Sequence, residues 1–499
     1  MAKFLRVFYL ILAAITFPLA VPADGRAGDV LTYHGDPARS GHFIVPGLDW
    51  DHARGLRLDE NFRAKVSGHV YAQPLYWRGS GSIAPLLLVA TEDDLVYAID
   101  ARSGSEIWKR SLDKPVPRSS LGCGNINPLG VTGTPVIDAA TQTVYLDAAV
   151  AGESGPRHLV FALSLKDGST LSGWPIDPGQ ALARANRSFT PRDQNQRGAL
   201  TIFDGRVYVP FGGHFGDCGD YYGVVVGISL ADPTNVTSWA TRARGGGIWA
   251  PGGLASDGMS LYAATGNTFG AKSFADGEMV VRLAGDLHRS DDKRDFFAPS
   301  DWRSLDARDV DLGGTNPLPI DVPQANGALM LALGKDGKAY LLDRSNLGGI
   351  GGQLAVDAVS LRSIITAPAL YPAQDPAQDG VFIAFHADGV QCPQRGGGLL
   401  VLKVRAGSPP KMSTAWCATF RGAGSAIATT TDGHTNPIVW ILGAEGDNRL
   451  HGYRGDNGEA LFNGPVLSGL RHFQTLIATE DRIYIAADGA VHAFMVQRP

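Results

Sequence analysis

The segment LLLVATEDDLVYAIDARSGSEIW, residues 86–108, carries the clearest structural pattern in the chain. It predicts three strands separated by two tight turns, because its apolar runs are bounded by turn-forming residues. Asp100 can accept hydrogen bonds from the second turn, and Gly104 permits a positive φ there. Trp108 brings a large ring that can pack between neighbouring sheets and an indole N–H that needs an acceptor. With Ala98, these residues define a repeat unit.

The same spacing returns in LGAEGDNRLHGYRGDNGEALF, residues 442–462. Weaker copies follow the order strand, turn, strand, turn, aromatic residue, and among them are units that end at Trp174, at Trp239 and towards Trp302. There are about eight such units, each of the length of a propeller blade. Four-stranded blades arranged radially leave few exposed sheet edges. The sequence therefore predicts an all-β, eight-bladed propeller of four-stranded antiparallel blades.

The last unit, residues 482–496, stops before an outer strand. We expect the N-terminal stretch VLTYHGDPARSG, residues 30–41, to supply this strand and close the ring. The expected propeller domain is residues 28–499. The alternative is an array of β-sandwich domains, which is less favoured because no linker between the units is long or polar.

Composition excludes one class of function. The chain has 499 residues, of which 63 are glycine and 30 are proline, and its formal net charge is −5. Charges of both signs are scattered and no long basic run is present, so we expect no nucleic-acid partner.

The N-terminus is typical of an export signal. Lys3 and Arg6 precede the apolar run VFYLILAAITFPLAV, and small residues end possible cleavage sites at Ala23 and Ala27. We expect residues 1–27 to be a signal peptide and the mature protein to be periplasmic or secreted, with no membrane span. An uncleaved anchor is the alternative.

Four cysteines in an exported chain favour disulfides, for which three pairings are possible. We favour Cys392 with Cys417, which bracket one expected hairpin, and Cys123 with Cys218, which lie in two glycine-rich loops. Four unpaired thiols are the alternative.

The stretch DARDVDLGGTNP, residues 306–317, contains the aspartates Asp306, Asp309 and Asp311. On an extended strand, residues two apart share a face, so Asp309 and Asp311 would repel each other unless a positive group lay between them. The stretch is either an acidic turn or part of a metal site.

The repeat resembles a known family. The VYAID...SG...W unit is similar to the tryptophan-docking repeat of quinoproteins that bind pyrroloquinoline quinone (PQQ), such as bacterial alcohol and methanol dehydrogenases. The opening YHGDPARSG is also similar to the start of their propellers. The repeat alone says little about function, because it also occurs in non-catalytic propellers, including an outer-membrane assembly factor.

The segment GGGIWAPGGLASDGMSLYAATGNTFG, residues 245–270, resembles a functional part of these quinoproteins. The resemblance implies that Trp249 forms the floor beneath the quinone and that Asn267 binds a metal ion through its side-chain oxygen. Next, RDVDLGGTN resembles the family's WD-x-D-G-T-N segment, which implies that Asp309 is the catalytic base and a metal ligand. Asp311 matches a second carboxylate of lanthanide-using members, and Lys335 matches the basic residue that contacts the reactive carbonyls of the quinone.

The resemblance thus implies two cofactors, PQQ and a calcium or lanthanide ion. A hard cation prefers oxygen ligands and can polarise a quinone carbonyl, and a carboxylate can take the substrate's hydroxyl proton. The chain departs from the family at two places. His214 stands where a glutamate ligand is expected, and Cys123 stands alone near the place of an adjacent cysteine pair. No CxxCH haem motif is present, so electrons would leave to a separate carrier.

Taken singly, each of these residues has a simpler interpretation. Trp249 could pack like the other tryptophans, Asn267 could form a turn, the aspartates could cap turns and Lys335 could be a solvated hairpin lysine. Their common order favours an exported PQQ-dependent oxidoreductase that acts on an alcohol or sugar hydroxyl and uses an external electron acceptor. The alternative is a non-catalytic propeller that binds a periplasmic protein, peptide or glycan as a scaffold.

Overall fold

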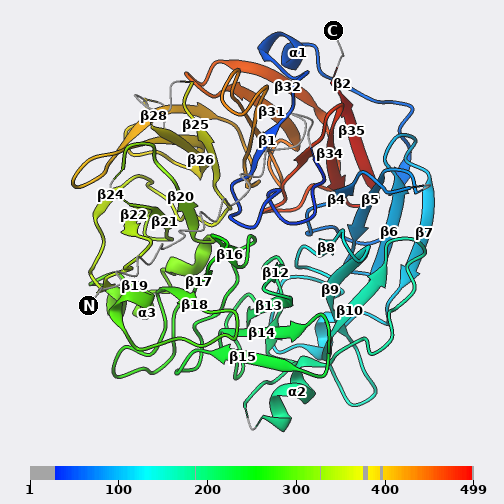
Figure 1. Ribbon diagram of the computed structural model, residues 1–499, viewed down its shortest axis with the longest axis vertical. Helices are drawn as coiled ribbons and strands as arrows, with labels where there is room; N and C mark the ends of the chain where they lie inside the picture. Colours follow the sequence, from blue (N-terminus) through cyan, green and yellow to red (C-terminus); the bar gives the residue numbers. More distant parts are fainter. Residues whose placement is uncertain are drawn as a thin grey trace, which may run out of the picture.

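A ring of eight β-sheets forms the molecule. The computed structural model describes residues 28–81, 83–185, 187–325, 327–374, 380–393 and 397–496. Within them the sheets are arranged around a central axis, each as one blade (Figure 1). The predicted all-β, eight-bladed propeller is confirmed. The expected signal peptide, residues 1–27, lies outside the described residues.

The first four blades follow one another along the chain, and neighbouring strands within them are mostly antiparallel. Blade two has three strands, and in place of a fourth it has isolated bridges from Thr170 and Ile176 to its last strand. The strands are β4 (Leu75–Trp77), β5 (Leu86–Ala90), β6 (Leu95–Asp100) and β7 (Glu106–Ser111) in blade one; β8 (Val136–Asp138), β9 (Thr143–Val150) and β10 (Arg157–Ser164) in blade two; β11 (Gln194–Asn195), β12 (Thr201–Phe203), β13 (Arg206–Gly213), β14 (Val224–Ser229) and β15 (Val236–Ala240) in blade three; and β16 (Ala255–Ser256), β17 (Leu261–Ala264), β18 (Val280–Leu283), β19 (Phe296–Ala298) and β23 (Gly349–Ile350) in blade four.

The last four blades complete the ring. Two of them also take strands from the N-terminal part of the chain. The strands are β20 (Leu318–Ile320), β21 (Leu329–Leu333), β22 (Lys338–Asp343) and β24 (Ala355–Ala358) in blade five; β25 (Ala369–Pro372), β26 (Val381–Ala387), β27 (Gly398–Arg405) and β28 (Lys411–Thr419) in blade six; β1 (His42–Ile44), β29 (Ile427–Thr430), β30 (Ile438–Leu442), β31 (Arg449–Arg454) and β32 (Ala460–Val466) in blade seven; and β2 (Arg57–Leu58), β3 (Ala64–Lys65), β33 (Ile477–Ala478), β34 (Arg482–Ala487) and β35 (Ala490–Met495) in blade eight.

The helices of the described residues are short and lie between strands. They are α1 (Trp50–Arg54), α2 (Pro178–Arg184) and α3 (Trp302–Ala307), with 3-10 turns at Arg118–Ser120, Lys293–Asp295 and Leu312–Gly314. Trp302, towards which we expected a repeat unit to end, begins α3 instead, and the outer strand of that unit is β19. Among the described residues no helix is long and apolar enough to cross a membrane.

The repeat motif joins neighbouring blades through an indole hydrogen bond and a ring contact. Asp100 accepts the backbone N–H of Ser103 at 2.8 Å, and Gly104 has φ +78°, as the turn requires. Trp108 in turn donates its indole N–H to the carbonyl of Leu165 in the next blade at 2.9 Å, and its ring lies against Gly168. Trp108 therefore fixes its blade to the next one by a partly buried ring and a satisfied indole N–H.

N-terminal strands close the ring, as predicted, but they come from a different segment than expected. The outer pairing of blade eight comes from β2 and β3, which pair antiparallel with β35, and not from residues 30–41. That stretch instead crosses the centre of the ring, where the dark blue segment before β1 lies in Figure 1. It contains left-handed residues at His34 and Arg39, which interrupt any strand. Fully buried Arg39 donates to the carbonyls of Leu200 and Leu254, so the segment plugs the middle of the propeller.

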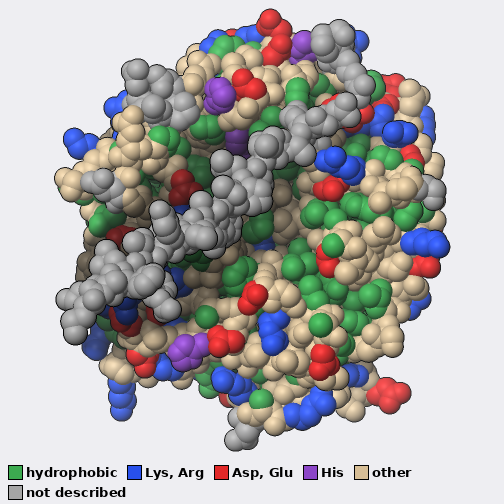
Figure 2. Space-filling view, viewed as in Figure 1, with side chains coloured by type: hydrophobic (Ala, Val, Ile, Leu, Met, Phe, Trp, Pro, Cys, Tyr) green, Lys and Arg blue, Asp and Glu red, His purple; other side chains and the backbone are tan. Residues whose placement is uncertain are grey.

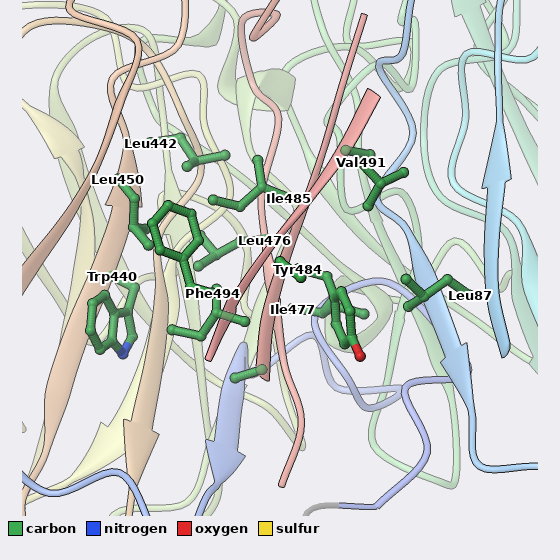
Figure 3. Close-up of a cluster of buried hydrophobic side chains, with 14 of the residues drawn as sticks. Leu87, Trp440, Leu442, Leu450, Leu476, Ile477, Tyr484, Ile485, Val491 and Phe494 are labelled. Carbon is green, nitrogen blue, oxygen red and sulfur yellow. The ribbon is translucent and has the colours of Figure 1, made fainter. Parts of the chain in front are cut away.

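The hydrophobic core is continuous across the closure. Trp440 and Leu450 of blade seven, Tyr484 and Phe494 of blade eight, and Leu87 of blade one belong to one buried cluster (Figure 3). On the outside, charged side chains of both signs are scattered over the face in Figure 2, as the sequence predicted. The closure is therefore held by apolar packing as well as by strand pairing.

Candidate functional site

A cavity of about 430 Å³ opens among the loops that connect the blades. It contains all five residues that the sequence singled out, although they come from separate positions along the chain. Its lining is Asn125, Asn195, Arg197, Gly213, His214, Phe215, Gly216, Asp217, Tyr221, Gly247, Trp249, Gly266, Asn267, Asp309, Asp311, Lys335, Ser363, Ile365, His472 and Phe473. The cavity is therefore the candidate functional site.

Trp249 and Lys335 lie one above the other in this cavity. Trp249 belongs to the glycine-rich loop between β15 and β16, and Lys335 belongs to the turn between β21 and β22. The Nζ atom of Lys335 lies 5.2 Å from the centre of the indole ring, which is a cation–π distance. An aromatic surface with a cation above it can hold a flat ligand that carries acceptor oxygens.

Lys335 lies between the two aspartates that raised the question of a positive partner. Its Nζ is 3.0 Å from Oδ1 of Asp309 and 2.6 Å from Oδ2 of Asp311. Asp309 is 60% exposed and faces the cavity, whereas Asp311 is 4% exposed. Burial lowers the pKa of Lys335, but the charges of Asp311 and Asp309 outweigh it and raise the pKa above its ordinary value. The group that relieves the repulsion between the aspartates is thus an ammonium.

Asn267 is tied to the same carboxylate. Its backbone N–H donates to Oδ1 of Asp311 at 2.8 Å, so both oxygens of Asp311 are occupied. Asp306, the third aspartate of the stretch, instead accepts the backbone N–H and the hydroxyl of Thr268. It anchors the loop and does not line the cavity.

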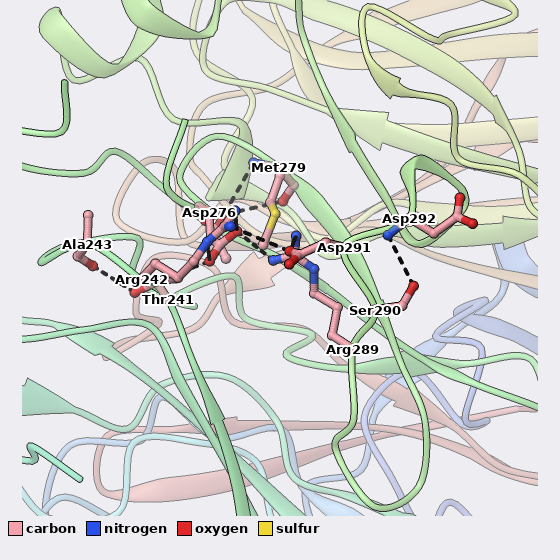
Figure 4. Close-up of polar contacts among 10 residues, drawn as sticks. Thr241, Arg242, Ala243, Asp276, Met279, Arg289, Ser290, Asp291 and Asp292 are labelled. Carbon is pink, nitrogen blue, oxygen red and sulfur yellow. Dashed lines mark hydrogen bonds and ion pairs between the residues drawn. The ribbon is translucent and has the colours of Figure 1, made fainter. Parts of the chain in front are cut away.

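The loop that carries Asn267 is held by a buried ion pair that does not itself line the cavity. Asp276 is 1% exposed and accepts hydrogen bonds from the guanidinium groups of Arg242 and Arg289 (Figure 4). Its backbone carbonyl accepts the hydroxyl of Thr265 at 2.7 Å. These contacts hold the residues before and after the loop in place, and they position Asn267 at the cavity wall.

Glu278 is a buried acid next to the site that sequence reasoning missed. Its Oε2 accepts the backbone N–H of Leu312 at 2.6 Å, and its Oε1 has no partner among the described residues. Burial, reinforced by the charge of Asp311, raises the pKa of Glu278 well above its ordinary value. The residue lies in an insertion with no local motif, so no sequence signal marked it.

His214, which stands where the resemblance places a glutamate, is a neutral loop histidine. Its Nε2 lies 3.1 Å from the carbonyl oxygen of Arg192, and burial lowers its pKa to about 4. Asp217, three residues later, also lines the cavity and accepts the hydroxyl of Tyr221 at 2.6 Å. Burial raises the pKa of Asp217, and the charges of Asp311 and Asp309 raise it further. Asp217 therefore faces the same acidic wall.

Both predicted disulfides are present. Cys392 pairs with Cys417, and Cys123 pairs with Cys218 across 95 residues of sequence. The second bond joins the loop that carries Asn125 to the loop that carries residues 215–217, and both loops line the cavity. It therefore fixes one wall of the site.

The chain resembles solved structures but matches no family model and no curated protein. A quinohemoprotein alcohol dehydrogenase from Comamonas testosteroni aligns with a TM-score of 0.67 at 16% identity, over 96% of this chain and 84% of that one. A quinohemoprotein alcohol dehydrogenase from Pseudomonas putida HK5 aligns with a TM-score of 0.67 at 15% identity, over 95% and 81%. A europium-containing methanol dehydrogenase aligns with a TM-score of 0.63 at 13% identity, over 93% and 90%. At these identities the likeness is one of fold, and the chain has the eight-bladed propeller fold of the quinoprotein dehydrogenases.

Proposed function

We propose that the protein is a PQQ-dependent oxidoreductase that oxidises a hydroxyl group of an alcohol or sugar and passes the electrons to an external acceptor. The observation that supports this most is the meeting of Trp249, Asn267, Asp309, Asp311 and Lys335 in one cavity. Nothing in their sequence positions requires five residues from two blades and their connecting loops to share a wall, unless that wall has a common role.

The residues present fit the quinone. The cavity offers a flat aromatic surface at Trp249 and an ammonium 5.2 Å from its ring centre. Asn195 adds a buried amide oxygen without a partner among the described residues, so the wall has unused hydrogen-bonding capacity. When bound, the quinone supplies an acceptor for two electrons and a hydrogen from the substrate carbon.

Four side chains of the cavity would then have separate roles in binding the ligand and moving the proton. Trp249 holds the flat ligand from one side, and Lys335 donates a hydrogen bond to an acceptor oxygen of that ligand. Asp309 is the carboxylate open to the cavity, so it is the group that takes the proton of the substrate hydroxyl. Asp311 remains buried beneath Lys335 and keeps the ammonium charged and in place.

A calcium or lanthanide ion fits these residues less well. Among the described residues no group of three or more His, Cys, Asp or Glu side chains is placed to hold a metal. Asp311 is already paired with Lys335 and Asn267, and His214 offers an imidazole that hard cations bind poorly. As they stand the residues do not form a metal site, and no proton or electron step is assigned to a metal. Metal binding by Asn267, Asp309 and Asp311 stays a prediction, tested by calorimetric titration with calcium and lanthanum.

The function is tested by dye-linked oxidation of a panel of alcohols and sugars after the purified protein is incubated with PQQ. Asp309→Ala is expected to lower kcat by about 100-fold or more, since a general base contributes that much. Asp113→Ala removes an exposed aspartate outside the cavity and serves as the matched control. Equal turnover in wild type and Asp309→Ala would reject the assignment of the base.

A second candidate function is a non-catalytic scaffold that binds a periplasmic protein, peptide or glycan. The observation that favours it is that Lys335 occupies the gap between Asp309 and Asp311, while His214 replaces the expected ligand. If PQQ does not bind and no hydroxyl compound is oxidised, this second function gains support.

We also propose that the protein works in the periplasm or outside the cell, because both cysteine pairs form disulfides and such bonds persist in oxidising compartments. Fractionation of the producing cells, with N-terminal sequencing of the mature chain, tests the location and the cleavage after residue 27.

A further inference from the structure

Phe215 is a large aromatic side chain that is left exposed at the cavity. It is 73% exposed, and it is one of the residues that line the cavity. Exposing a phenyl ring gives up the free energy that its burial would provide. An aromatic ring at the wall of a cavity can recover that free energy by packing against a ligand.

The turn that carries Phe215 is ordered by contacts on both sides of the ring. The backbone N–H of Asp217 donates to the carbonyl of His214 at 3.0 Å, so the chain makes a tight turn around Phe215 and Gly216. Gly216 has φ +98°, which suits its place in such a turn. Cys218, which follows, is held by a disulfide. The ring is therefore in place before a ligand arrives, and this lowers the entropy cost of binding.

Asp217 has one carboxylate oxygen that takes part in no hydrogen bond. Its Oδ1 accepts the hydroxyl of Tyr221 at 2.6 Å, whereas its Oδ2 has no such partner among the described residues. The charges of Asp309 and Asp311 act on this carboxyl, so Asp217 lies within electrostatic reach of the acid that we assign as the base. A hydroxyl both donates and accepts, so it can pair with Asp217 in either protonation state.

Asn195 provides a second, independent acceptor. It is 8% exposed, it lines the cavity, and its Oδ1 has no partner among the described residues. β11, which contains Asn195, pairs with the end of β13, and β13 leads directly into the turn of Phe215. An amide oxygen can only accept, so this atom requires a ligand group that donates. Blade three thus contributes one exposed ring and two oxygen acceptors to the cavity.

This combination fits a ligand that carries several hydroxyl groups. The C–H face of a sugar ring is apolar and can pack on an aromatic ring, while its hydroxyls donate to carboxylate and amide oxygens. A simple alcohol has a single hydroxyl, which Asp309 would take. It would leave the acceptors of Asp217 and Asn195 without water and without a partner, which is unfavourable. An anionic substrate would be repelled by the two carboxylates.

We propose that Phe215, Asp217 and Asn195 form a polyol subsite, so that the substrate is a sugar or another compound with neighbouring hydroxyl groups rather than a simple alcohol. One hydroxyl lies at Asp309 and is oxidised. A neighbouring hydroxyl pairs with Asp217 or Asn195, and the carbon skeleton packs on Phe215. The inference rests on the proposed function and deepens it by naming the substrate class. It changes no step of the oxidation.

The first test compares matched substrates in the dye-linked assay after incubation with PQQ. 1-Propanol and 1,2-propanediol differ by one hydroxyl, and cyclohexanol and glucose have rings of the same size but differ in their number of hydroxyls. We expect kcat/KM to be at least about 10-fold higher for the polyol of each pair, because a site built for hydroxyls disfavours analogues that lack them. The second test needs no turnover, and is a calorimetric titration of the purified full-length protein with glucose and with cyclohexanol in the absence of PQQ.

Two substitutions at Asp217 test the carboxylate. Asp217→Ala is expected to lower the preference for 1,2-propanediol over 1-propanol by about 10-fold or more, since it removes a charge-assisted hydrogen bond. Asp217→Asn keeps an acceptor for Tyr221 and tolerates the left-handed backbone at φ +50°, and it should retain part of the preference. Asp220→Ala changes an exposed acid of the same loop outside the cavity and should behave as wild type.

Two substitutions at Phe215 test the ring. Phe215→Ala is expected to lower kcat/KM and affinity for glucose by about 10-fold, whereas Phe215→Tyr keeps a ring and should resemble wild type. Met259→Ala removes another exposed apolar side chain, 78% exposed and outside the cavity, and should have no effect on either measurement. Thermal unfolding checks the fold of each variant.

The two tests separate the subsite from the proposed function. If no compound is oxidised but glucose binds and its affinity falls in Asp217→Ala and Phe215→Ala, the subsite stands and the proposed function fails. If hydroxyl compounds are oxidised without preference for polyols, or if both variants keep that preference, the subsite is overturned and the proposed function stands. An effect of one variant alone removes the other residue from the subsite. Neither oxidation nor binding of glucose by wild type overturns both.

Discussion

The ammonium of Lys335 lies 2.6 Å from a carboxylate oxygen of Asp311, and the other oxygen of Asp311 accepts the backbone N–H of Asn267. Through these two contacts the turn of blade five is joined to the loop of blade four at the wall of the cavity. The relationship makes Asp311 a structural acid and leaves Asp309 as the acid that solvent and ligand can reach.

Removing the cation from this pair should destabilise the fold. Lys335→Met leaves the carboxylate of Asp311 buried without a counter-charge, so the free energy of unfolding is expected to fall by about 2–3 kcal/mol. Urea unfolding at neutral pH measures the loss. The double variant Lys335→Met/Asp311→Asn removes both charges and should recover most of it. An equal loss in the single and double variants would show that the ion pair is not the cause.

Asp94 should make the protein less stable as pH rises. Both of its carboxylate oxygens lack a partner among the described residues, and burial raises its pKa to about 9. In the unfolded chain the pKa of this carboxyl is about 4. At any pH between about 4 and 9, Asp94 therefore takes up a proton when the chain folds. The stability from this group is therefore complete below about pH 4 and is lost as pH rises through 9. The melting temperature of wild type should fall between pH 5 and 9, and the fall should be smaller in Asp94→Asn. Asp93→Asn is the control, and a profile unchanged by Asp94→Asn would contradict the prediction.

The two disulfides should both stabilise the fold, but only one of them should also affect ligand binding. The bond between Cys123 and Cys218 closes 95 residues and the bond between Cys392 and Cys417 closes 25, so loop entropy predicts costs of about 4.7 and about 3.5 kcal/mol when they are removed. Only the first bond joins loops that line the cavity. Replacing its cysteines by serine should therefore weaken ligand binding as well as stability, whereas the second pair should affect stability alone. Denaturant unfolding and fluorescence titration measure the two effects. Weaker binding after loss of the second pair would argue against a local role for the first.

Contact with a tryptophan ring should make the fold more sensitive to alanine at Gly458 than at a glycine with open space around it. A Cβ at Gly458 would lie 2.6 Å from the ring of Trp416, whose indole N–H donates to the carbonyl of Gly455 at 2.8 Å. Gly489 has a similar φ, +82° against +77°, but a Cβ there would meet open space. Gly489→Ala is expected to cost about 1 kcal/mol for backbone strain alone, and Gly458→Ala about 2–4 kcal/mol, since it also displaces the ring. Thermal and denaturant unfolding compare the two, and equal costs would show that the contact with the ring is unimportant.

The fold was predictable because its information is local and repeated. The turn at Asp100 and Gly104 and the ring of Trp108 recur with the same spacing. Each blade can therefore be recognised from its own stretch of sequence. The closing strands were not predictable, because β2 and β3 have two residues each and no periodicity can be read from them. The stretch at residues 30–41 was misplaced since its similarity to the start of a propeller says nothing of where the segment packs.

The candidate site was partly predictable for a related reason. Trp249, Asn267 and Lys335 were singled out by their order along the chain and their resemblance to quinoprotein segments, and the structure brings them to one cavity. Glu278 escaped prediction because its significance lies in a missing partner, which only a three-dimensional arrangement reveals.

Blade eight joins β2 near the start of the chain to β35 near its end. Its sheet cannot be completed until β34 and β35 exist, so a ribosome must make the chain at least as far as β35 before the ring can close. Contacts between such distant residues form slowly, because a long loop has to be closed first. Until blade eight is complete, blades one and seven each have one uncovered side. The incomplete ring can then pair with another chain. The order of synthesis thus makes ring closure a late step in folding, and until then the incomplete sheet can pair with another chain.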